Sequence, residues 1–415
     1  MPVWLSDSCF TSRSPCPLRR SSEVELSETL QRPYSLPSDL AFLASDVAER
    51  VLAPQAEEID RDARWPREGM QALAEAGLLG LLVPERLGGH GQGLHALAEI
   101  AEVLGRACSS TAMCFAMHCV GTAVIAAKAT PDQERRFLRP IAEGRHVTTL
   151  ALSEPGTGSH FYLPRSTFDP DGESYVVNGK KSFITNGGHA DSYVLSAVAP
   201  GSELDPGTFT CLLVEAGSAG LDWGAPWSGL GMRGNSSRAA GLNRISVPKA
   251  NLLGEEGDQI WYIFEVVAPY FLTAMAGVYI GIGQAALDLS VAHISGHKFS
   301  HTTARLAENP AIVEQIADMW ARLERARRLL HYAARLGDAG SPEAATAIFA
   351  SKIDVADAAV ALTNSAMQLV GGRGYQADGQ LSRLLRDAQA AHVMSPTTHL
   401  LKSWLGRSVL GLPPL

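Results

Sequence analysis

The sequence predicts an α+β protein with an N-terminal helical domain, a middle β-barrel or β-sandwich domain and a C-terminal four-helix bundle. Three observations predict this order. Apolar residues recur at helical spacing over residues 36–144, strand-like runs with turn signals fill residues 146–254, and helical spacing returns from about Gly257. At 415 residues the chain is too long for a single small core. We expect domains at residues 36–145, 146–254 and 255–415, after a flexible arm at residues 1–35.

The first 35 residues differ in composition from the rest of the chain. They are rich in Ser and Pro, and Arg13, Arg19 and Arg20 cluster among them, but no apolar run is long enough for a secretory signal. A transit peptide would be poor in acids, whereas three glutamates lie between residues 23 and 28. We therefore expect a loose arm on a cytoplasmic protein.

Charge and cysteine content narrow the classes of site. The formal net charge of −8 argues against a nucleic-acid surface, which needs a basic face. The six cysteines form no CxxC pair and show no His/Cys ligand spacing. We expect reduced thiols, and neither a disulfide framework nor a metal site.

Helices are predicted in the first region by apolar spacing. Leu40, Leu43, Val47 and Val51 fall on one face of a helix. Pro131, followed by an aspartate, begins another helix, because proline suits a first turn and an acid complements the helix dipole there.

The middle region has the pattern of strands. An apolar, β-branched run covers residues 147–152, and further strand candidates cover residues 192–198 and 208–214. Asp171-Gly172 and Asn178-Gly179 are typical of hairpin turns on either side of a short strand. Together these segments predict a small barrel or sandwich.

The last region is helical again. Ile312, Ile316, Met319 and Leu323 form an apolar stripe, and residues 344–369 are a second long helix-forming segment. Four long helices with short connections predict a bundle.

One apolar stretch, Val266–Leu287, carries no formal charge over 22 residues and meets the length criterion for a membrane span. It contains Pro269, Gln284 and three glycines, and no Lys/Arg cluster flanks it. We expect a helix buried inside the bundle and no membrane span. The GxGxxA motif at residues 281–286 lies inside this helix, so its glycines indicate close helix packing rather than a dinucleotide site.

Two polar segments that follow predicted strands are candidates for ligand binding. Ser153–Ser159 is rich in small residues that let backbone N–H groups turn toward a flat or anionic ligand, although a polar loop capping the β-domain fits the composition equally well. Phe183–Gly188 places an aromatic ring and a hydroxyl at alternate positions, which share one strand face. Phe183 and Thr185 are therefore placed to stack on a heteroaromatic ring and bond its edge; a core phenylalanine and a surface threonine are the alternative.

This pair of segments resembles the flavin-binding loops of the acyl-CoA dehydrogenase family. Further matches follow in the family's order over roughly Leu36–Leu412. They are Gly231-Met232-Arg233-Gly234-Asn235-Ser236, Val247-Pro248, Asn251-Leu252-Leu253-Gly254, Gln368-Leu369-Val370-Gly371-Gly372-Arg373-Gly374-Tyr375 and Arg386-Asp387-Ala388. The resemblance implies the three domains given above, with FAD bound between the β-domain and the bundle.

The resemblance also implies contacts to FAD in both loops and in the C-terminal region. The residues concerned are Leu152, Ser153, Gly158, Ser159, Phe183, Thr185, Lys298, Gln368, Gly371, Gly372 and Thr397. Ser159 would also face the pantetheine arm of the substrate. A neighbouring subunit would offer the segment around Gln368 to the adenosine half, which implies a homodimer or homotetramer. His160 replaces the family's Asp at the end of the first loop, and Lys298 stands beside the position of the family's diphosphate-binding Arg.

The proton acceptor departs from the family pattern. The family's reaction removes the α-proton of an acyl thioester while a β-hydride moves to the flavin, so a carboxylate stands across the substrate from the flavin. Its usual position, nine residues after Arg386, holds Ser395, and the alternative position on the first bundle helix holds Phe271. A serine hydroxyl alone does not accept this proton. Glu265 and His392 are weak candidates for the base, and each also fits a solvated or capping role.

The leading hypothesis is FAD-dependent α,β-dehydrogenation of an acyl thioester, carried on CoA or on an acyl-carrier protein, with an electron-transfer partner or O₂ as acceptor. The alternative is a flavin-dependent monooxygenase or oxidase on the same fold, because such enzymes need no α-proton base. A third class is a flavoprotein that binds a protein partner or DNA, and the acidic balance makes DNA the weakest option.

Overall fold

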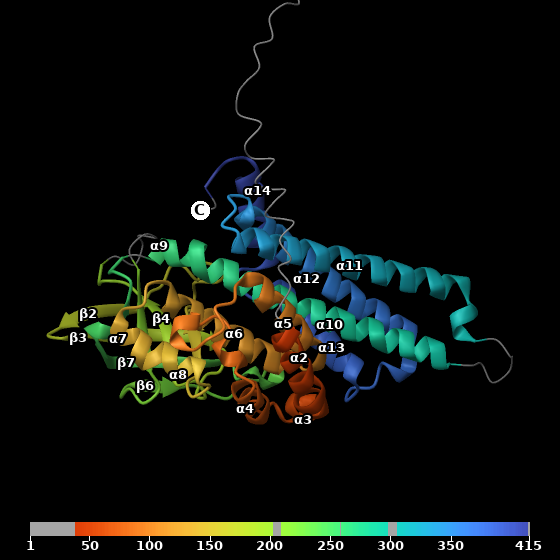
Figure 1. The fold of residues 1–415 in the computed structure, drawn as a ribbon, viewed down its shortest axis with the longest axis horizontal. Coiled ribbons are helices and arrows are strands. Elements are labelled where there is room, and N and C mark those ends of the chain that lie inside the picture. The colour runs from red at the N-terminus through yellow and green to blue at the C-terminus, as the bar shows by residue number, and fades with distance from the viewer. Residues whose placement is uncertain (1–37, 202–208, 258, 298–304, 414–415) are drawn as a thin grey trace, which may run out of the picture. The chain divides into compact units, whose positions relative to one another are not determined.

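The computed structural model describes residues 38–201, 209–257, 259–297 and 305–413. The expected arm at residues 1–35 and the expected cofactor residue Lys298 lie outside the described residues. The described part runs through a helical region, a β region and a second helical region, in the predicted order (Figure 1).

The first region is helical throughout. Its elements are α2 (Ser38–Val47), η1 (Ala48–Leu52), α3 (Ala53–Asp62), α4 (Arg67–Glu75), η2 (Leu78–Gly80), η3 (Glu85–Leu87), α5 (Leu94–Ala107), α6 (Ser109–Ala127), α7 (Pro131–Gln133), η4 (Glu134–Leu138) and α8 (Arg139–Ala142). A helix does begin at Pro131, as predicted. A capping box fixes this start, because the Thr130 hydroxyl accepts from the Gln133 N–H and the Gln133 side chain accepts from the Thr130 N–H.

The middle region forms two four-stranded sheets that face each other as an open sandwich rather than a closed barrel. The strands are β1 (Thr148–Ala151), β2 (Thr167–Asp171), β3 (Ser174–Ile184), β4 (Ser192–Ala197), β5 (Thr210–Glu215), β6 (Leu221–Trp223), β7 (Arg238–Pro248) and β8 (Leu252–Leu253). One sheet has the order β1-β4-β5-β8 and the other β2-β3-β7-β6. Every residue of β4 is buried, since an apolar cluster covers one face of its sheet and α6 packs on the other.

One of the two predicted hairpin turns is wrong. Asp171-Gly172 does form the turn between β2 and β3, with Gly172 at φ +57°. Asn178-Gly179 instead lies inside β3, at a register shift between Val177 and Gly179. A Cβ at Gly179 would stand 2.2 Å from Ser166 Oγ, so this glycine allows the segment around Ser166 to approach β3 closely.

The second helical region contains long helices that lie side by side (Figure 1). Its elements are α9 (Gln259–Trp261), η7 (Tyr262–Val267), α10 (Ala268–Gly296), η8 (Leu306–Glu308), α11 (Pro310–Asp338), α12 (Ala344–Val370), η9 (Gly371–Arg373), α13 (Gln380–Val393) and α14 (Thr398–Val409). Helix α10 packs against α11, α12 and α13 of the bundle and also against α5 and α6. It therefore connects the two helical regions.

The apolar stretch Val266–Leu287 lies in η7 and α10, and most of it is buried. Among the described residues, two helices are long and apolar enough to cross a membrane, Ser109–Ala127 and Tyr262–Gly296, and 89% and 78% of their most apolar windows are buried inside the protein. Core helices pass the same test of length and composition. The burial supports the core interpretation, and the absence of a membrane span stays a prediction.

The glycines of the GxGxxA motif serve helix packing. A Cβ at Gly281 would stand 2.3 Å from the main-chain oxygen of Glu102, and one at Gly277 would stand 2.5 Å from that of Ala98. On the α5 side, a Cβ at Gly105 would stand 2.6 Å from the oxygen of Val278. The two helices touch at backbone level, which leaves no room for a dinucleotide loop at this motif.

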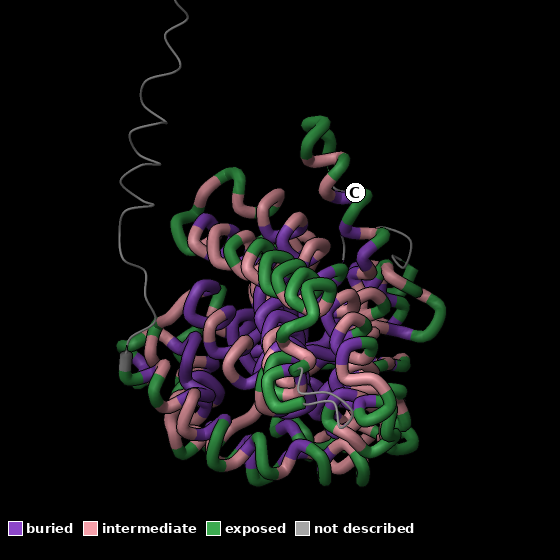
Figure 2. Tube along the Cα trace, turned by 90° about the vertical axis from the view of Figure 1, so that its right-hand side faces the viewer, coloured by how far each residue is buried: buried purple, intermediate pink, exposed green. Residues whose placement is uncertain are grey.

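A single apolar cluster extends from α2 through α5, α6 and α10 to Trp404 in α14, and it includes Leu150 and Val194 of the first sheet. Figure 2 shows buried residues along the inner helices and exposed residues around the outside. The sandwich has its own smaller cluster between the sheets. The first sheet is thus covered by helices on one side, and its loops lie against the bundle.

Candidate active site

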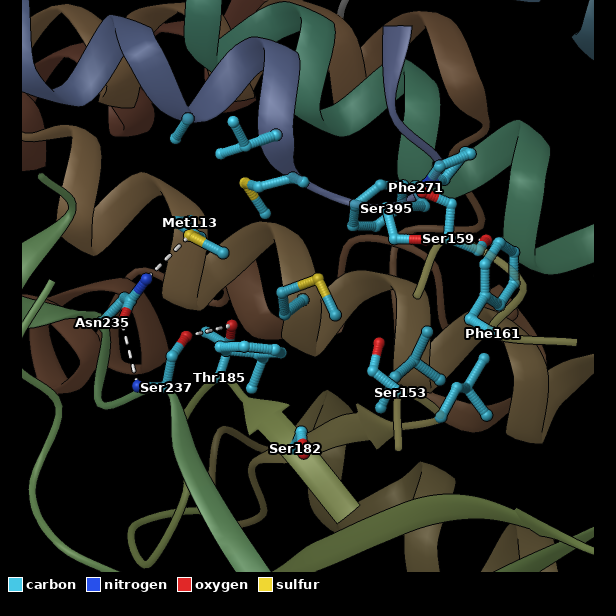
Figure 3. Close-up of a pocket in the computed structure, with 18 of the residues that line it drawn as sticks. Met113, Ser153, Ser159, Phe161, Ser182, Thr185, Asn235, Ser237, Phe271 and Ser395 are labelled. Atoms are coloured by element: carbon cyan, nitrogen blue, oxygen red, sulfur yellow. Dashed lines mark hydrogen bonds between the residues drawn. The ribbon is translucent and has the colours of Figure 1, made fainter. Parts of the chain in front are cut away.

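A cavity of about 830 Å³ lies where the loops of the β-domain meet α6, α10 and α13 (Figure 3). Its walls are mainly apolar, with Met113 and Met117 from α6, Phe271 from α10 and Val393 from α13. Volume and lining are those of a site for a small molecule or cofactor.

The cavity brings together many of the residues that the sequence marked. Those that line it are Leu152, Ser153, Gly158, Ser159, Phe183, Thr185, Phe271 and Ser395. In Figure 3, Ser395, Ser159 and Phe271 lie together at one end, and Thr185, Ser237 and Asn235 lie at the other. The two loops and the two family base positions therefore face a common space.

The first loop has an open, glycine-dependent backbone. Gly156 and Gly158 have φ of +88° and +55°, and a Cβ at either would meet nothing within 4 Å. Glycine is favoured at these two positions because φ is positive, and not because a side chain would clash with a neighbour. The backbone of the loop is consequently accessible to a ligand in the cavity.

A buried ion pair anchors the same loop. Lys181 Nζ lies 2.6 Å from Glu154 Oε1 and also donates to the main-chain oxygen of Ser196 at 2.6 Å. The Glu154 carboxylate accepts from the N–H groups of Arg165 and Ser166. The two charged side chains are 0% and 3% exposed, so water does not compete with these bonds.

Glu154 is ionised and fully engaged. Burial alone would raise its pKa, but the Lys181 charge and the hydrogen bonds from Lys181, Ser166 and Arg165 hold the pKa of Glu154 below its usual value. It is also the one ionisable side chain among the described residues that line the cavity. Its place in the ion pair makes it a structural anchor and not a proton acceptor.

The second loop presents an aromatic side chain to solvent. Phe183 has φ +54° and is 68% exposed, an unusual state for a large apolar residue. Thr185 is buried, and its Oγ1 lies 3.3 Å from Ser237 Oγ. Asn186 fixes the loop, since its Oδ1 accepts from Trp65 Nε1 and its Nδ2 donates to the main-chain oxygen of Cys114, both at 2.9 Å.

A third loop, Gly231–Ser236, completes the wall of the cavity. The Arg386-Asp387 motif of α13 holds this loop in place. The buried Asp387 carboxylate accepts from the Met232 N–H at 2.6 Å and from the Ser109 hydroxyl. A Cβ at Gly231 would stand 2.5 Å from the main-chain oxygen of Arg386, so the loop lies directly on α13. The motif positions this loop at the cavity.

These features fit a flat aromatic cofactor with a polar edge. The exposed Phe183 ring offers a stacking surface, and its edge meets Trp227 with ring centroids 6.3 Å apart. Trp227 also lines the cavity, and its Nε1 is buried without a hydrogen-bond partner in the described part of the chain. The isoalloxazine ring of FAD supplies both an aromatic face and hydrogen-bond acceptors.

The structure brings neither weak base candidate to the cavity. Glu265 is exposed on η7. His392 is half-buried, its Nδ1 lies 3.0 Å from Thr398 Oγ1, and its Nε2 lies 3.8 Å from Asp357 Oδ1. Burial lowers the pKa of His392. Neither residue is among those lining the cavity.

The remaining C-terminal residues lie outside the cavity wall. Thr397 caps α14, accepting from the Leu400 N–H at 3.4 Å, and the Ser159 hydroxyl donates to it at 3.4 Å. Gln368 and Gly372 are exposed at the end of α12, and Gly371 beside them has φ +64°. Their contact with FAD bound by a neighbouring subunit stays a prediction.

Several residues that line the cavity were missed by sequence reasoning. They are Met113, Phe161, Trp227 and Ser237, while Asn235 was marked only as part of the Gly231–Ser236 match. Asn235 bonds the Ser237 N–H at 2.9 Å and lies 3.1 Å from Met113 Sδ, so it joins the third loop to α6. The Gly231–Ser236 match pointed to this loop, whereas Met113 lies on a helix apolar on every face, where periodicity marks no functional side.

Comparisons with known proteins agree along the chain. Family profiles of the acyl-CoA dehydrogenase N-terminal, middle and C-terminal domains match residues 39–145, 149–244 and 273–410. The chain is 33% identical over 372 residues to cyclohex-1-ene-1-carbonyl-CoA dehydrogenase of Geobacter metallireducens, covering 89% of this chain and 96% of the relative.

Two solved structures are similar as well. One, described as the electron transferring flavoprotein of Acidaminococcus fermentans, superposes with a TM-score of 0.86 at 29% identity, covering 91% of this chain and 99% of the other. Butyryl-CoA dehydrogenase from Megasphaera elsdenii superposes with a TM-score of 0.85 at 26% identity and the same coverage. The three domains, their order and the cavity at their junction have one explanation: the chain belongs to the acyl-CoA dehydrogenase family.

Proposed function

We propose that the chain is an FAD-dependent oxidoreductase that removes hydrogen across the α,β-bond of an acyl thioester. Membership of the family indicates both the cofactor and the reaction class. The observation that carries the proposal is the cavity itself, with Phe183 and Thr185 from the β-domain and Phe271 and Ser395 from the bundle around one space.

The chain's own residues would divide the work as follows. Phe183 would stack on the flavin, and the Thr185 hydroxyl and Trp227 Nε1 would bond its edge. Ser159 borders the same space and is placed to contact the pantetheine arm. The apolar wall of Met117 and Phe271 would exclude water from the reacting carbons. FAD, when bound, would supply the hydride acceptor for this chemistry.

Proton removal is the weak point of this site. Glu154 is held by Lys181, and the Ser395 hydroxyl stands where the family places a carboxylate. Because a hydroxyl accepts the α-proton poorly, position 395 limits the rate of the reaction.

We further propose CoA as the carrier of the acyl group and an electron-transferring flavoprotein as the acceptor. Support comes from the CoA thioester in the name of the Geobacter relative and from the similarity to the Acidaminococcus structure. A homodimer or homotetramer is supported by the exposed segment around Gln368. The comparisons do not favour the monooxygenase or oxidase alternative, since the Geobacter relative, at 33% identity, is named as a dehydrogenase.

The test is anaerobic mixing of the FAD-loaded protein with acyl-CoAs of increasing chain length and with acyl-carrier-protein thioesters. The expected result is bleaching of the flavin absorbance and formation of the 2,3-enoyl product. Protein that is folded but takes up no FAD would refute the cofactor assignment. Bound FAD that no thioester bleaches would refute the reaction.

A further inference from the structure

A second cluster of functional side chains lies outside the cavity, between α5 and α11. His95 and Glu99 stand one turn apart on α5 and face His331 of α11. His331 Nδ1 lies 3.3 Å from His95 Nε2, and His95 Nε2 lies 3.8 Å from Glu99 Oε1. One atom from each residue falls within 4.8 Å of the other two. We propose that these three residues bind a divalent first-row transition cation, with Zn²⁺ as the reference ion.

The spacing suits zinc. A tetrahedral Zn²⁺ with Zn–N bonds of about 2.0–2.1 Å holds two imidazole nitrogens roughly 3.3 Å apart. The His331 and His95 nitrogens already have this separation. Glu99 Oε1, 3.8 Å from His95 Nε2, needs to come about half an ångström closer to that nitrogen, and it lies within 4.8 Å of the His331 ligand atom. The Glu99 side chain is 30% exposed.

A carboxylate stands behind His331. Glu102 Oε2 lies 3.8 Å from His331 Nε2, the ring nitrogen opposite the Nδ1 that faces His95, so this carboxylate is placed to orient the imidazole when Nδ1 binds a metal. Arg327 holds Glu102 in place with an Nε–Oε1 distance of 2.9 Å.

The surroundings contain charges of both signs. Glu99 and Glu102 are acidic, whereas Arg327 is engaged by Glu102 and Glu324, and Arg335 adds a positive charge near His95. The side chains of His95, His331 and Glu99 are 7%, 16% and 30% exposed, so the site is shielded and still has an entry path along Glu99. Without metal, the two imidazoles would share an N–H···N hydrogen bond, and the experiment separates these two states.

A metal here would act as a clamp between the two helical regions. His95 and His331 are 236 residues apart in the chain, and they hold α5 against α11. Any ion that binds the folded form and not the unfolded form raises the stability of the protein. The sequence predicted no metal site because ligands so far apart have no recognisable spacing.

The test uses the full-length, FAD-loaded protein, stripped with a chelator and then dialysed against Zn²⁺. We expect one Zn²⁺ per chain and a higher thermal midpoint with Zn²⁺ than without it. His331→Gln and Glu99→Gln should each weaken Zn²⁺ binding by more than tenfold, and Glu102→Gln by about ten- to a hundredfold. His399→Gln, which changes an exposed histidine on α14, should leave binding unchanged.

Flavin content and circular dichroism report whether each variant is folded, and Glu99→Gln, on a partly exposed side chain, serves if His331→Gln misfolds. A wild-type protein that retains no Zn²⁺ after dialysis would overturn the proposal. So would Zn²⁺ bound equally by the wild type and by the Glu99 and His331 variants, because the ion would then sit elsewhere. Co²⁺ offers an independent readout through the visible absorption of a tetrahedral N/O site.

Discussion

Ser395 donates its hydroxyl hydrogen bond to the main-chain oxygen of Ser159 across 3.0 Å. This bond ties the segment after α13 to the first loop of the β-domain at the edge of the cavity. At the position where the family has a carboxylate that faces the substrate, this chain has a serine whose hydroxyl is hydrogen-bonded to the backbone. The relationship makes position 395 the most informative site for mutation.

Ser395→Glu should accelerate anaerobic flavin reduction by acyl-CoA. A positioned carboxylate in this apolar cavity supplies general-base catalysis, which contributes about 10²- to 10⁴-fold. Stopped-flow absorbance of the flavin measures the effect. Ser395→Gln has nearly the same size without basicity and should stay at the wild-type rate; equal gains in both variants would show that shape and not proton transfer is responsible.

Phe183→Ala should weaken FAD binding by about ten- to a hundredfold, the value of burying one phenylalanine ring. Its effect on folding should be small, since the ring is 68% exposed. Fluorescence titration of the apoprotein with FAD gives the affinity. Phe42→Ala removes a ring of similar exposure, 69%, from α2 and should leave the affinity unchanged. Retained affinity in Phe183→Ala would exclude stacking on this ring.

Lys181→Met should lower the free energy of unfolding by about 3–5 kcal/mol, because it leaves the Glu154 carboxylate buried without its partner. The double variant Glu154→Gln, Lys181→Met should recover part of this loss. Urea denaturation measures both. Lys180→Met changes the exposed neighbour and should have almost no effect, and an equal loss there would argue against the ion pair as the cause.

Gly281→Ala should destabilise the protein by about 1–3 kcal/mol or more, since the new methyl meets the backbone of α5, 2.3 Å from Glu102 O. Gly283→Ala is the matched control on the same helix. There the methyl meets only the side-chain ends of Leu362 and Leu323, at 2.9 and 3.2 Å, and alanine gains about 1 kcal/mol of helix propensity. Thermal midpoints compare the two, and similar midpoints would argue against backbone contact at Gly281.

His118 should make stability fall with pH below neutrality. It is fully buried on α6, its Nδ1 accepts from the Thr148 N–H at 3.1 Å, and its Nε2 lies 3.0 Å from Leu79 O. Burial lowers the pKa of His118 to about 4. Between the unfolded value near 6.5 and this value the unfolded chain binds the extra proton, so stability is complete above about pH 6.5 and declines toward pH 4, by about 3 kcal/mol in total.

His118→Gln should flatten this decline while lowering stability at pH 7, because one of the two ring contacts is lost. Urea midpoints at several pH values between 4 and 7.5 give the slope for each protein. His146 and Asp191 also affect the pKa of His118, and both residues are present in the wild type and in the variant. An identical slope in the variant would assign the pH dependence to other residues.

The sequence predicted the order of the regions because each carries its own periodicity. It located both cavity loops through their resemblance to a family's flavin-binding loops, since composition alone left a purely structural role open. Sequence reasoning failed where the same residue types fit two local structures. Asn178-Gly179 has the residues of a hairpin turn, yet the close approach of Ser166 uses the same glycine inside a strand.

Long-range contacts were beyond sequence reasoning for a different reason. The partners of Glu154 are Lys181 and two backbone groups, and no pattern in the first loop announces them. Helix α6 is apolar on every face, so Met113 could not be assigned to the cavity rather than to the core. Such assignments depend on packing, which periodicity describes only for helices with one apolar side.

The first turn of α5 is capped by the side chain of Asp338, a residue that the ribosome adds much later. The N–H groups of Leu94 and His95 donate to Asp338 at 2.6 and 2.9 Å, and 244 residues separate Leu94 from that aspartate. A ribosome adding about 5–20 residues per second needs roughly 12–50 s to cover the distance. For most of that interval the nascent N-terminal region lacks both this cap and the contacts of Gly277 and Gly281 of α10, so α5 gains its full set of contacts only after the C-terminal helices are made.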